Sequence, residues 1–186
     1  MNVYDVTYKK IIEPLYGNKR NENYDSELLQ SNILPHAYSI NERVDMTMYE
    51  TYSIDPDGCE DADDAFSIFK ENGKMFLAIH IADPTEHINI ESSLWKDMEK
   101  RVVTKYPSFV SPIHMIPHEI MAKSSLMVNE YGNIKLAITV LSEINTYTYE
   151  PMGSIKLLFT KIKVDSENAL SYTKACLLYT SPSPRD

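Results

Sequence analysis

The sequence predicts an α+β fold with a mixed, largely antiparallel sheet and flanking helices. Three observations predict it: Asn72-Gly73 separates two apolar runs, two longer strand-like segments follow, and one segment has apolar residues at helical spacing. An Asn-Gly pair between apolar runs is the strongest short-range indication of a hairpin. Strands grouped in this way, with helices kept apart from them, are typical of the α+β class.

The first part of the chain is polar, and we expect regular structure only from about residue 49. We therefore interpret residues 1–49 as a leader or linker. Residues 49–54 have the composition of a strand, which ends at Asp55-Pro56 because proline disfavours helix at the preceding residue and lacks a donor. Residues 65–70 and 74–82 are the two strands of the predicted hairpin.

A helix is predicted over residues 92–105, beginning at one of two serines that suit the N-cap position. Trp95, Met98 and Val102 lie at i, i+3 and i+7 in it, so we expect them to form one buried stripe. After a loop with three prolines, residues 134–144 and 147–164 have the composition of two further strands.

These elements define one partial domain at residues 50–175. The last eleven residues, 176–186, show no periodicity and do not continue the pattern before them. We interpret them as a non-native tail and leave them out of the fold prediction.

Composition indicates an ordinary globular chain. It has 186 residues, of which 43% are apolar and 24% charged, and its net charge is -9. That charge argues against a basic nucleic-acid footprint, although bound metal would cancel several negative charges. Cys59 and Cys176 have no framework spacing, there is no signal-peptide pattern, and no apolar stretch approaches ~20 residues. We therefore expect a cytoplasmic protein with no membrane partner.

The most informative segment is the acidic run from Asp55 to Asp64, which has six acids in ten positions. The nearest cationic residues along the chain are Arg43 and Lys70. Two carboxylates ~4 Å apart repel by about 4 kcal/mol at an effective dielectric near 20. Strand-like segments on both sides hold the run in the folded domain, so its acids must become protonated or bind a cation. Mg²⁺ is the expected cofactor because it prefers oxygen ligands.

The spacing of the aspartates in this run indicates which of them can act together. Asp61 and Asp63 share a face if the segment is extended, whereas Asp63 and Asp64 point to opposite faces. Asp55 can fold back across the loop, which gives a two-sided nest for one or two metal ions. Such sites activate water and stabilise the leaving oxygen in phosphodiester cleavage.

Other acidic patterns were compared with the same residues. A calcium-binding EF-hand loop fails, because Cys59 and Glu60 stand where that pattern needs an acidic residue and glycine. A plain acidic surface loop agrees equally well with composition alone. Spacing alone therefore leaves the choice between a metal site and a solvated loop open.

The motif Ile54-Asp55-Pro56 through Asp61-Ala62-Asp63-Asp64-Ala65, followed by Ile79-His80-Ile81-Ala82-Asp83, resembles the catalytic domain of the ribonuclease II/ribonuclease R (RNB-domain) family. The resemblance covers about residues 45–175. Further stretches occur in the family's order: Ser92-Ser93-Leu94, Arg101 to Tyr106, Pro117, Ser124-Ser125-Leu126 and Leu170-Ser171-Tyr172.

The resemblance implies a Mg²⁺-dependent hydrolytic exoribonuclease that degrades single-stranded RNA from the 3′ end and releases nucleoside 5′-monophosphates. It implies that Asp55 and Asp64 are direct metal ligands and that Asp61 supports the metal and positions its water. Asp63 is then the residue whose loss most reduces turnover while sparing RNA binding.

Two further positions are implied to bind RNA. Tyr106 lies where the family has a ring that stacks on a base, and a structural role after the helix is an equal alternative. Arg101 is the best candidate on a basic helix side that otherwise serves as a solvated face. His80 and Asp83 could support the carboxylates, but a satisfied core histidine is the favoured interpretation of His80.

The chain departs from the family pattern in length. Most of the C-terminal part of the catalytic domain and the family's C-terminal oligonucleotide-binding barrel have no counterpart here, and residues 1–49 represent at most part of its N-terminal barrels. We therefore expect the 186 residues to be weakly active or inactive on their own. The alternatives are a non-catalytic RNA-binding fragment and a metal-binding fragment of the same fold.

Overall fold

The computed structural model describes residues 8–21, 24–27, 29, 41–59, 61–108 and 110–180. The chain divides into two compact units. The helical unit combines Met1–Ala37 with Pro84–Met121, and the sheet unit combines Tyr38–Asp83 with Ala122–Asp186.

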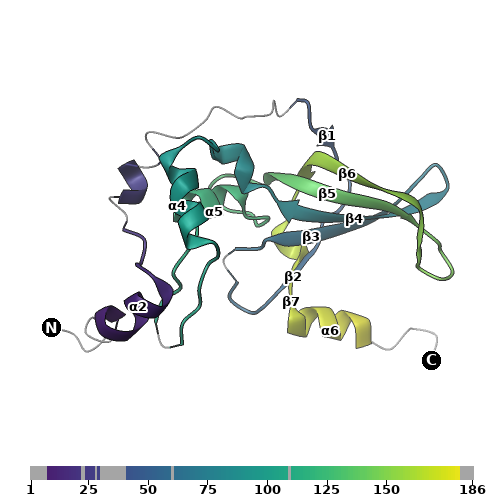
Figure 1. Ribbon diagram of the computed structural model, residues 1–186. Helices are drawn as coiled ribbons and strands as arrows, with labels where there is room; N and C mark the ends of the chain where they lie inside the picture. The colour runs from purple at the N-terminus through teal and green to yellow at the C-terminus, as the bar shows by residue number, and fades with distance from the viewer. Residues whose placement is uncertain are drawn as a thin grey trace. The chain divides into compact units, whose positions relative to one another are not determined.

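The sheet unit is built on five strands that lie side by side in Figure 1. Their order is β1-β6-β5-β4-β3, and every neighbouring pair is antiparallel except β1 and β6. The strands are β1 (Val44–Asp45), β3 (Asp64–Glu71), β4 (Lys74–Ala82), β5 (Ile134–Ile144) and β6 (Pro151–Lys163). This confirms the predicted mixed, largely antiparallel sheet.

A second, two-stranded sheet pairs β2 (Ser53–Asp55) with β7 (Ala169–Ser171) in parallel. Between β6 and β7 lies the short helix η3 (Ser166–Asn168), and α6 (Tyr172–Thr180) follows β7. The strand predicted at 49–54 is thus shorter than expected, although Tyr52 adds one antiparallel bridge to Phe66.

The β3–β4 hairpin confirms the turn predicted at Asn72-Gly73. Asn72 has φ of 50° and Gly73 has φ of 78°, so both residues adopt the left-handed conformation that this tight turn requires. The strand predicted at 147–164 begins later, at Pro151, because residues 145–150 form the turn between β5 and β6. In that turn Asn145 Oδ1 accepts hydrogen bonds from the backbone N–H groups of Tyr147 and Thr148.

The core of the sheet unit lies against one face of the sheet. Small residues of the strands contribute to it, and larger side chains from the segments around the sheet fill the space above them: the cluster comprises Met46, Ala62, Ala65, Ala78, Leu126, Ala137, Ile162 and Val164. Met46 and β1 belong to the stretch that we expected to be a leader, so residues 44–46 are part of the sheet unit.

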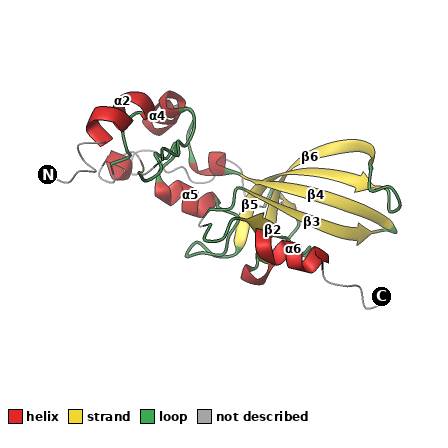
Figure 2. Ribbon diagram, turned by 90° about the horizontal axis from the view of Figure 1, so that it is seen from below, coloured by secondary structure: helices red, strands yellow, loops and turns green. Residues whose placement is uncertain are grey.

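The helical unit contains η1 (Tyr8–Ile12), α2 (Glu13–Tyr16), η2 (Pro84–His87) and α4 (Ser93–Arg101), and α5 (His118–Ser124) begins in it. Helices are red in Figure 2, where α2, α4 and α5 are labelled. A separate apolar cluster forms its core and consists of Leu29, Ile88, Leu94, Met98 and Ile120.

Helix α4 begins as predicted and ends earlier. Ser92 is its N-cap, and the Ser92 Oγ accepts a hydrogen bond of 3.0 Å from the backbone N–H of Trp95. The prediction that Val102 is buried is wrong. Val102 has φ of 69° and a 69% exposed side chain, because the chain turns left-handed there and leaves the helix.

No helix in the described part of the chain is long and apolar enough to cross a membrane. The stretch 176–186 that we interpret as a tail lies partly in α6, and residues 181–186 fall outside the described residues. Its origin stays a prediction.

Candidate active site

The acidic run lies in the sheet unit as a loop between two strands. Asp55 is the last residue of β2, and Asp64 is the first residue of β3. Asp55 pairs with Ser171 of β7, while Asp64 pairs with Ile81 of β4. The backbone N–H of Ala82 also donates a hydrogen bond of 2.8 Å to the carbonyl oxygen of Asp63. Both ends of the run are therefore attached to regular structure, as predicted.

A further anchor holds the middle of this loop at Ala62, which is fully buried. The Ala62 N–H donates a hydrogen bond of 3.2 Å to the Ser125 Oγ, and the Ala62 carbonyl accepts one of 2.8 Å from the Leu126 N–H. Asp61 and Asp63 flank this buried residue. Sequence reasoning gave Ser125 no role, because a hydrogen bond between residues so far apart in the chain leaves no local pattern.

The carboxylates of the run influence one another. Partial desolvation of its carboxyl group raises the pKa of Asp63, and the negative charges of Asp64 and Asp55 raise this pKa further. The repulsion expected from the sequence is therefore present between three of the four predicted residues. Asp55 and Asp61 are half-buried, whereas Asp63 and Asp64 are exposed.

Cys59 lies inside the loop and contacts two of its acids. The Cys59 Sγ is 3.8 Å from Asp55 Oδ1 and 3.3 Å from the carbonyl oxygen of Asp61. Burial is the main factor that raises the pKa of the Cys59 thiol, which keeps the thiol protonated. A protonated thiol can donate to these oxygens, so Cys59 supports the conformation of the loop.

The predicted metal nest is not assembled as a coordination sphere. Among the described residues, no three His, Cys, Asp or Glu side chains are grouped so that they could hold a metal ion. The donor chemistry nevertheless fits Mg²⁺, because Asp55, Asp63 and Asp64 offer oxygen ligands and the negative charges of Asp64 and Asp55 raise the pKa of Asp63. A bound cation would remove that repulsion.

His80 is fully buried in the sheet, and both of its ring nitrogens contact hydroxyl groups. Its Nε2 is 3.1 Å from the Ser67 Oγ, and its Nδ1 is 2.8 Å from the Thr139 Oγ1. Thr51 and Thr160 extend this chain of polar contacts across the neighbouring segments. Burial lowers the pKa of His80 to about 4. The favoured interpretation, a satisfied core histidine, is confirmed.

Asp83 has a structural partner as well. Its Oδ2 accepts a hydrogen bond of 2.7 Å from the Arg43 Nη2, and both side chains are almost completely buried. Arg43 also donates to the carbonyl oxygens of Ala137 and Thr160. This ion pair joins the segment before β1 to the end of β4, and it gives Asp83 a role other than supporting the acidic run.

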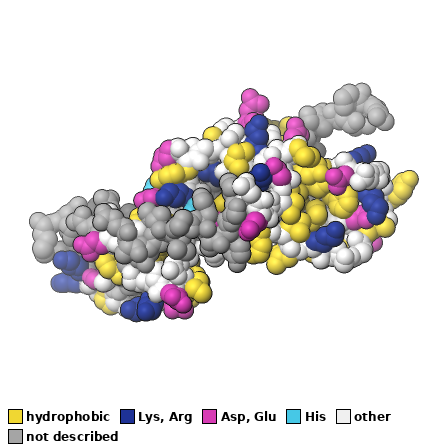
Figure 3. All heavy atoms as spheres, turned by 90° about the horizontal axis from the view of Figure 1, so that it is seen from above, with side chains coloured by type: hydrophobic (Ala, Val, Ile, Leu, Met, Phe, Trp, Pro, Cys, Tyr) yellow, Lys and Arg dark blue, Asp and Glu magenta, His cyan; other side chains and the backbone are white. Residues whose placement is uncertain are grey.

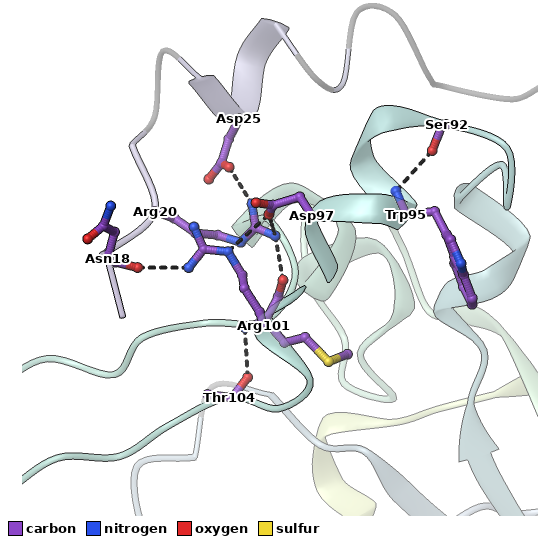
Figure 4. Close-up of polar contacts among 9 residues, drawn as sticks. Asn18, Arg20, Asp25, Ser92, Trp95, Asp97, Arg101 and Thr104 are labelled. Carbon is purple, nitrogen blue, oxygen red and sulfur yellow. Dashed lines mark hydrogen bonds and ion pairs between the residues drawn. The ribbon is translucent and has the colours of Figure 1, made fainter. Parts of the chain in front are cut away.

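The two predicted RNA contacts belong to the helical unit. Tyr106 is 77% exposed, so its ring is accessible. Arg101 is half-buried, with its Nε donating to Asp97 Oδ2 at 3.0 Å and its Nη1 donating to the Asn18 carbonyl at 2.8 Å. Figure 4 shows Asp97 shared between Arg101 and Arg20. Most of the hydrogen-bonding capacity of Arg101 is thus used within the protein.

Comparison with known proteins connects this chain to a nuclease family. The family model of the RNB domain matches residues 43–181. Exoribonuclease 2 of Xenorhabdus bovienii is 43% identical over 81 residues, which are 42% of this chain and 12% of that protein. The exosome complex exonuclease RRP44 of Homo sapiens is 30% identical over 135 residues, which are 72% of this chain and 13% of the human protein.

Solved structures show the same fold at low sequence identity. RNase R of Mycoplasma genitalium in complex with double-stranded RNA has a TM-score of 0.71 and 16% identity, over 89% of this chain and 28% of that one. Yeast Ssd1, described as a pseudonuclease, has a TM-score of 0.68 and 21% identity, over 83% of this chain and 19% of that one. All four comparison proteins are several times longer than the matched segment.

Proposed function

The chain belongs to the RNB domain family, and from this premise we propose that it is the metal-binding part of a Mg²⁺-dependent 3′-to-5′ exoribonuclease. The substrate is single-stranded RNA, and the products are nucleoside 5′-monophosphates. The observation that carries the proposal is the acidic loop itself, which is anchored at both ends and at Ala62 while its carboxylates repel one another.

Asp55 and Asp64 are the proposed ligands of Mg²⁺, since Asp55 ends the strand before the loop and Asp64 begins the strand after it. When bound there, Mg²⁺ supplies positive charge against the phosphodiester and lowers the pKa of water. Asp61, a half-buried residue of the loop, would support the metal and position its water. Asp63, which lies next to the proposed ligand Asp64, would be the residue whose loss most reduces turnover while RNA binding is retained.

Tyr106 and Arg101 are the proposed RNA contacts of the helical unit. An exposed tyrosine ring can stack on a base, which is worth ~1–3 kcal/mol and tolerates any sequence. Arg101 donates to described residues through Nε and Nη1, and its third guanidinium nitrogen, Nη2, is the one proposed to contact a phosphate.

The chain alone is proposed to be weakly active, because an exoribonuclease site also needs fixed cations opposite the developing phosphate charge. The nearest cationic residues along the chain are Arg43, which pairs with Asp83, and Lys70. A second candidate function is non-catalytic RNA binding. The similarity of fold to the pseudonuclease Ssd1 favours it.

A single-turnover RNA assay separates these functions. The 186-residue chain, in excess over a single-stranded RNA labelled in its 3′-terminal nucleotide, is incubated with and without Mg²⁺. We expect slow release of monophosphates that requires Mg²⁺ and decreases at least tenfold in Asp63→Asn, with RNA binding unchanged. The matched control is Asp57→Asn, which removes an exposed carboxylate of the same loop outside the motif.

The outcomes are distinct for each function. RNA binding without hydrolysis, indifferent to Mg²⁺ and to Asp63→Asn, would assign the chain to non-catalytic binding. Equal losses in Asp57→Asn and Asp63→Asn would show that loop charge alone matters and would remove the proposed role of Asp63. Neither result depends on a fast reaction, because single-turnover conditions detect one cleavage per chain.

A further inference from the structure

A hollow of about 280 Å³ lies beside the C-terminal end of α4 in the helical unit. It forms where residues 16–18, which follow α2, lie against the last turn of α4 and the segment after it. Three of its lining residues are cations, Lys100, Arg101 and Lys105, although the whole chain has a net charge of -9. Cations gathered around one hollow attract a ligand with negative charge.

Hydrogen bonds between the two segments hold this hollow in shape. The Lys105 Nζ donates a hydrogen bond of 2.6 Å to the Tyr16 carbonyl oxygen, and the Arg101 Nη1 donates one of 2.8 Å to the Asn18 carbonyl oxygen. Between these two carbonyls, Gly17 has φ of 91°, a conformation that residues with a side chain rarely adopt. The hollow is therefore formed by the fold before any ligand enters it.

The arginine of the hollow belongs to a network whose charges balance. Asp97 accepts hydrogen bonds of 3.0 Å from the Arg101 Nε and 2.9 Å from the Arg20 Nη2, and Arg20 also pairs with Asp25. Figure 4 shows these four side chains together. Two arginines and two aspartates neutralise one another, so this network adds little net charge to the hollow.

Lys100 and Lys105 therefore supply the excess positive charge. Of the described residues that line the hollow, Asp97 is the one acid, and the two arginines already neutralise it. An ammonium group has three donors, and Lys105 uses one of them for Tyr16, so two remain for a ligand. On the face drawn in Figure 3, cationic side chains (dark blue) lie interspersed with acidic ones (magenta). Two unneutralised lysines in one hollow are thus a local feature.

Two positive charges match a phosphate monoester, which carries about −1.5 to −2 at pH 7, better than a phosphodiester, which carries one negative charge. The volume suits a small ligand, since drug-sized molecules occupy pockets of about 300–1,000 Å³. Tyr16 and Val103, which are 38% and 54% exposed, also line the hollow and offer apolar surface to a base or a ribose.

We propose that this hollow binds the phosphate monoester of a nucleotide, with Lys100 and Lys105 on the phosphate and Tyr16 against the nucleoside. Two sources have this chemistry: a free nucleoside 5′-monophosphate and the 5′-phosphate end of an RNA. The first source, as a reaction product, rests on the proposed function. Binding by lysines needs no metal, which separates this site from the acidic run.

Calorimetric titration of the 186-residue chain at pH 7 in the presence of EDTA tests the site. The probe is adenosine 5′-monophosphate. Adenosine lacks the phosphate, and the dinucleotide ApA offers a phosphodiester in place of the monoester. We expect saturable binding of adenosine 5′-monophosphate, and binding at least tenfold weaker for adenosine and for ApA.

Three variants locate the binding. Lys100→Gln and Lys105→Gln should each weaken the binding of adenosine 5′-monophosphate at least fivefold. Lys96→Gln is the matched control, because it makes the same charge change at an exposed position of the same helix outside the hollow, and it should leave the affinity unchanged. Circular dichroism of each variant verifies that the fold is retained.

Two single-stranded RNAs of one sequence, with a 5′-phosphate or a 5′-hydroxyl, distinguish the sources. If the RNA end is the ligand, the phosphorylated RNA binds at least fivefold tighter and Lys100→Gln abolishes the difference. Equal binding of both RNAs, with adenosine 5′-monophosphate still bound, assigns the site to the free nucleotide.

Three results would overturn the proposal: no binding of millimolar adenosine 5′-monophosphate, equal affinity for adenosine, or the same loss of affinity in Lys96→Gln as in the two hollow variants. The titration contains no Mg²⁺ and measures no hydrolysis. A failure of the proposed enzymatic function therefore leaves its result interpretable.

Discussion

Two groups of carboxylates in this protein have opposite surroundings. Asp83 and Asp97 each face arginine: Asp83 pairs with Arg43 in the sheet unit, and Asp97 binds Arg20 and Arg101 in the helical unit. The acidic run instead combines carboxylates with carboxylates, and Asp63 has a raised pKa as a result. Carboxylates that stabilise a fold are neutralised by the fold. Those of the run retain a repulsion that a cation from outside can remove.

The largest effect is expected where a neutralised carboxylate is most deeply buried. Asp83→Asn removes the negative charge that pairs with the buried Arg43 guanidinium, so we expect the free energy of unfolding to fall by about 3–5 kcal/mol. Urea denaturation measures it. The control is Lys74→Gln, which breaks the exposed Lys74–Glu143 pair and should cost about 0–1 kcal/mol. Equal losses of unfolding free energy in the two variants would show that the buried Asp83 pair contributes no more to stability than the exposed Lys74 pair.

The polar interior of the sheet gives a pH-dependent effect of similar size. His80 has a pKa of about 4 in the fold against 6.5 ordinarily, so between these values the unfolded chain binds a proton that the folded chain does not. Stability is therefore highest above pH 6.5 and falls by about 3 kcal/mol as the pH decreases to 4.

His80→Gln should remove this part of the pH dependence, because glutamine has no titrating group and retains one donor and one acceptor for Ser67 and Thr139. Urea denaturation at pH 7, 5.5 and 4.5 checks it. His118→Gln, at an exposed position, serves as the control and should leave the slope unchanged. If both variants follow the unaltered protein at every pH, the histidine has no such role.

Asp97→Asn should have a smaller effect, because its two arginine partners are only partly buried. The substitution weakens bonds of 2.9 Å from the Arg20 Nη2 and 3.0 Å from the Arg101 Nε, so we expect a loss of about 1–3 kcal/mol. Glu99→Gln, on an exposed position of the same helix, is the matched control. A loss no greater than in this control would show that the arginines find other acceptors.

Local sequence patterns predicted the parts of the fold that depend on neighbouring residues. The β3–β4 hairpin and β5 agree with the sequence because Asn-Gly turn chemistry and apolar runs act within a few positions. Val102 illustrates the limit: helical spacing placed it in the buried stripe, but the chain reverses there. The Arg43–Asp83 pair joins residues forty positions apart, a distance at which single-sequence patterns have no signal.

The candidate site shows the same division. The motif located all four aspartates, and the structure shows that three of them interact electrostatically. Their anchoring by Ser125 and Leu126 depends on which segments become neighbours. This feature therefore required the tertiary structure.

The most direct test of the central claim is a Mg²⁺ titration of the 186-residue chain at pH 7, followed by the side-chain carboxyl carbon resonances of its aspartates. We predict saturable shifts at Asp55 and Asp64 while the resonances of Asp83 and Asp97 stay in place. Resonances of the run that do not respond to millimolar Mg²⁺, or shifts of equal size at Asp97, would contradict the claim that the acidic run is a magnesium site.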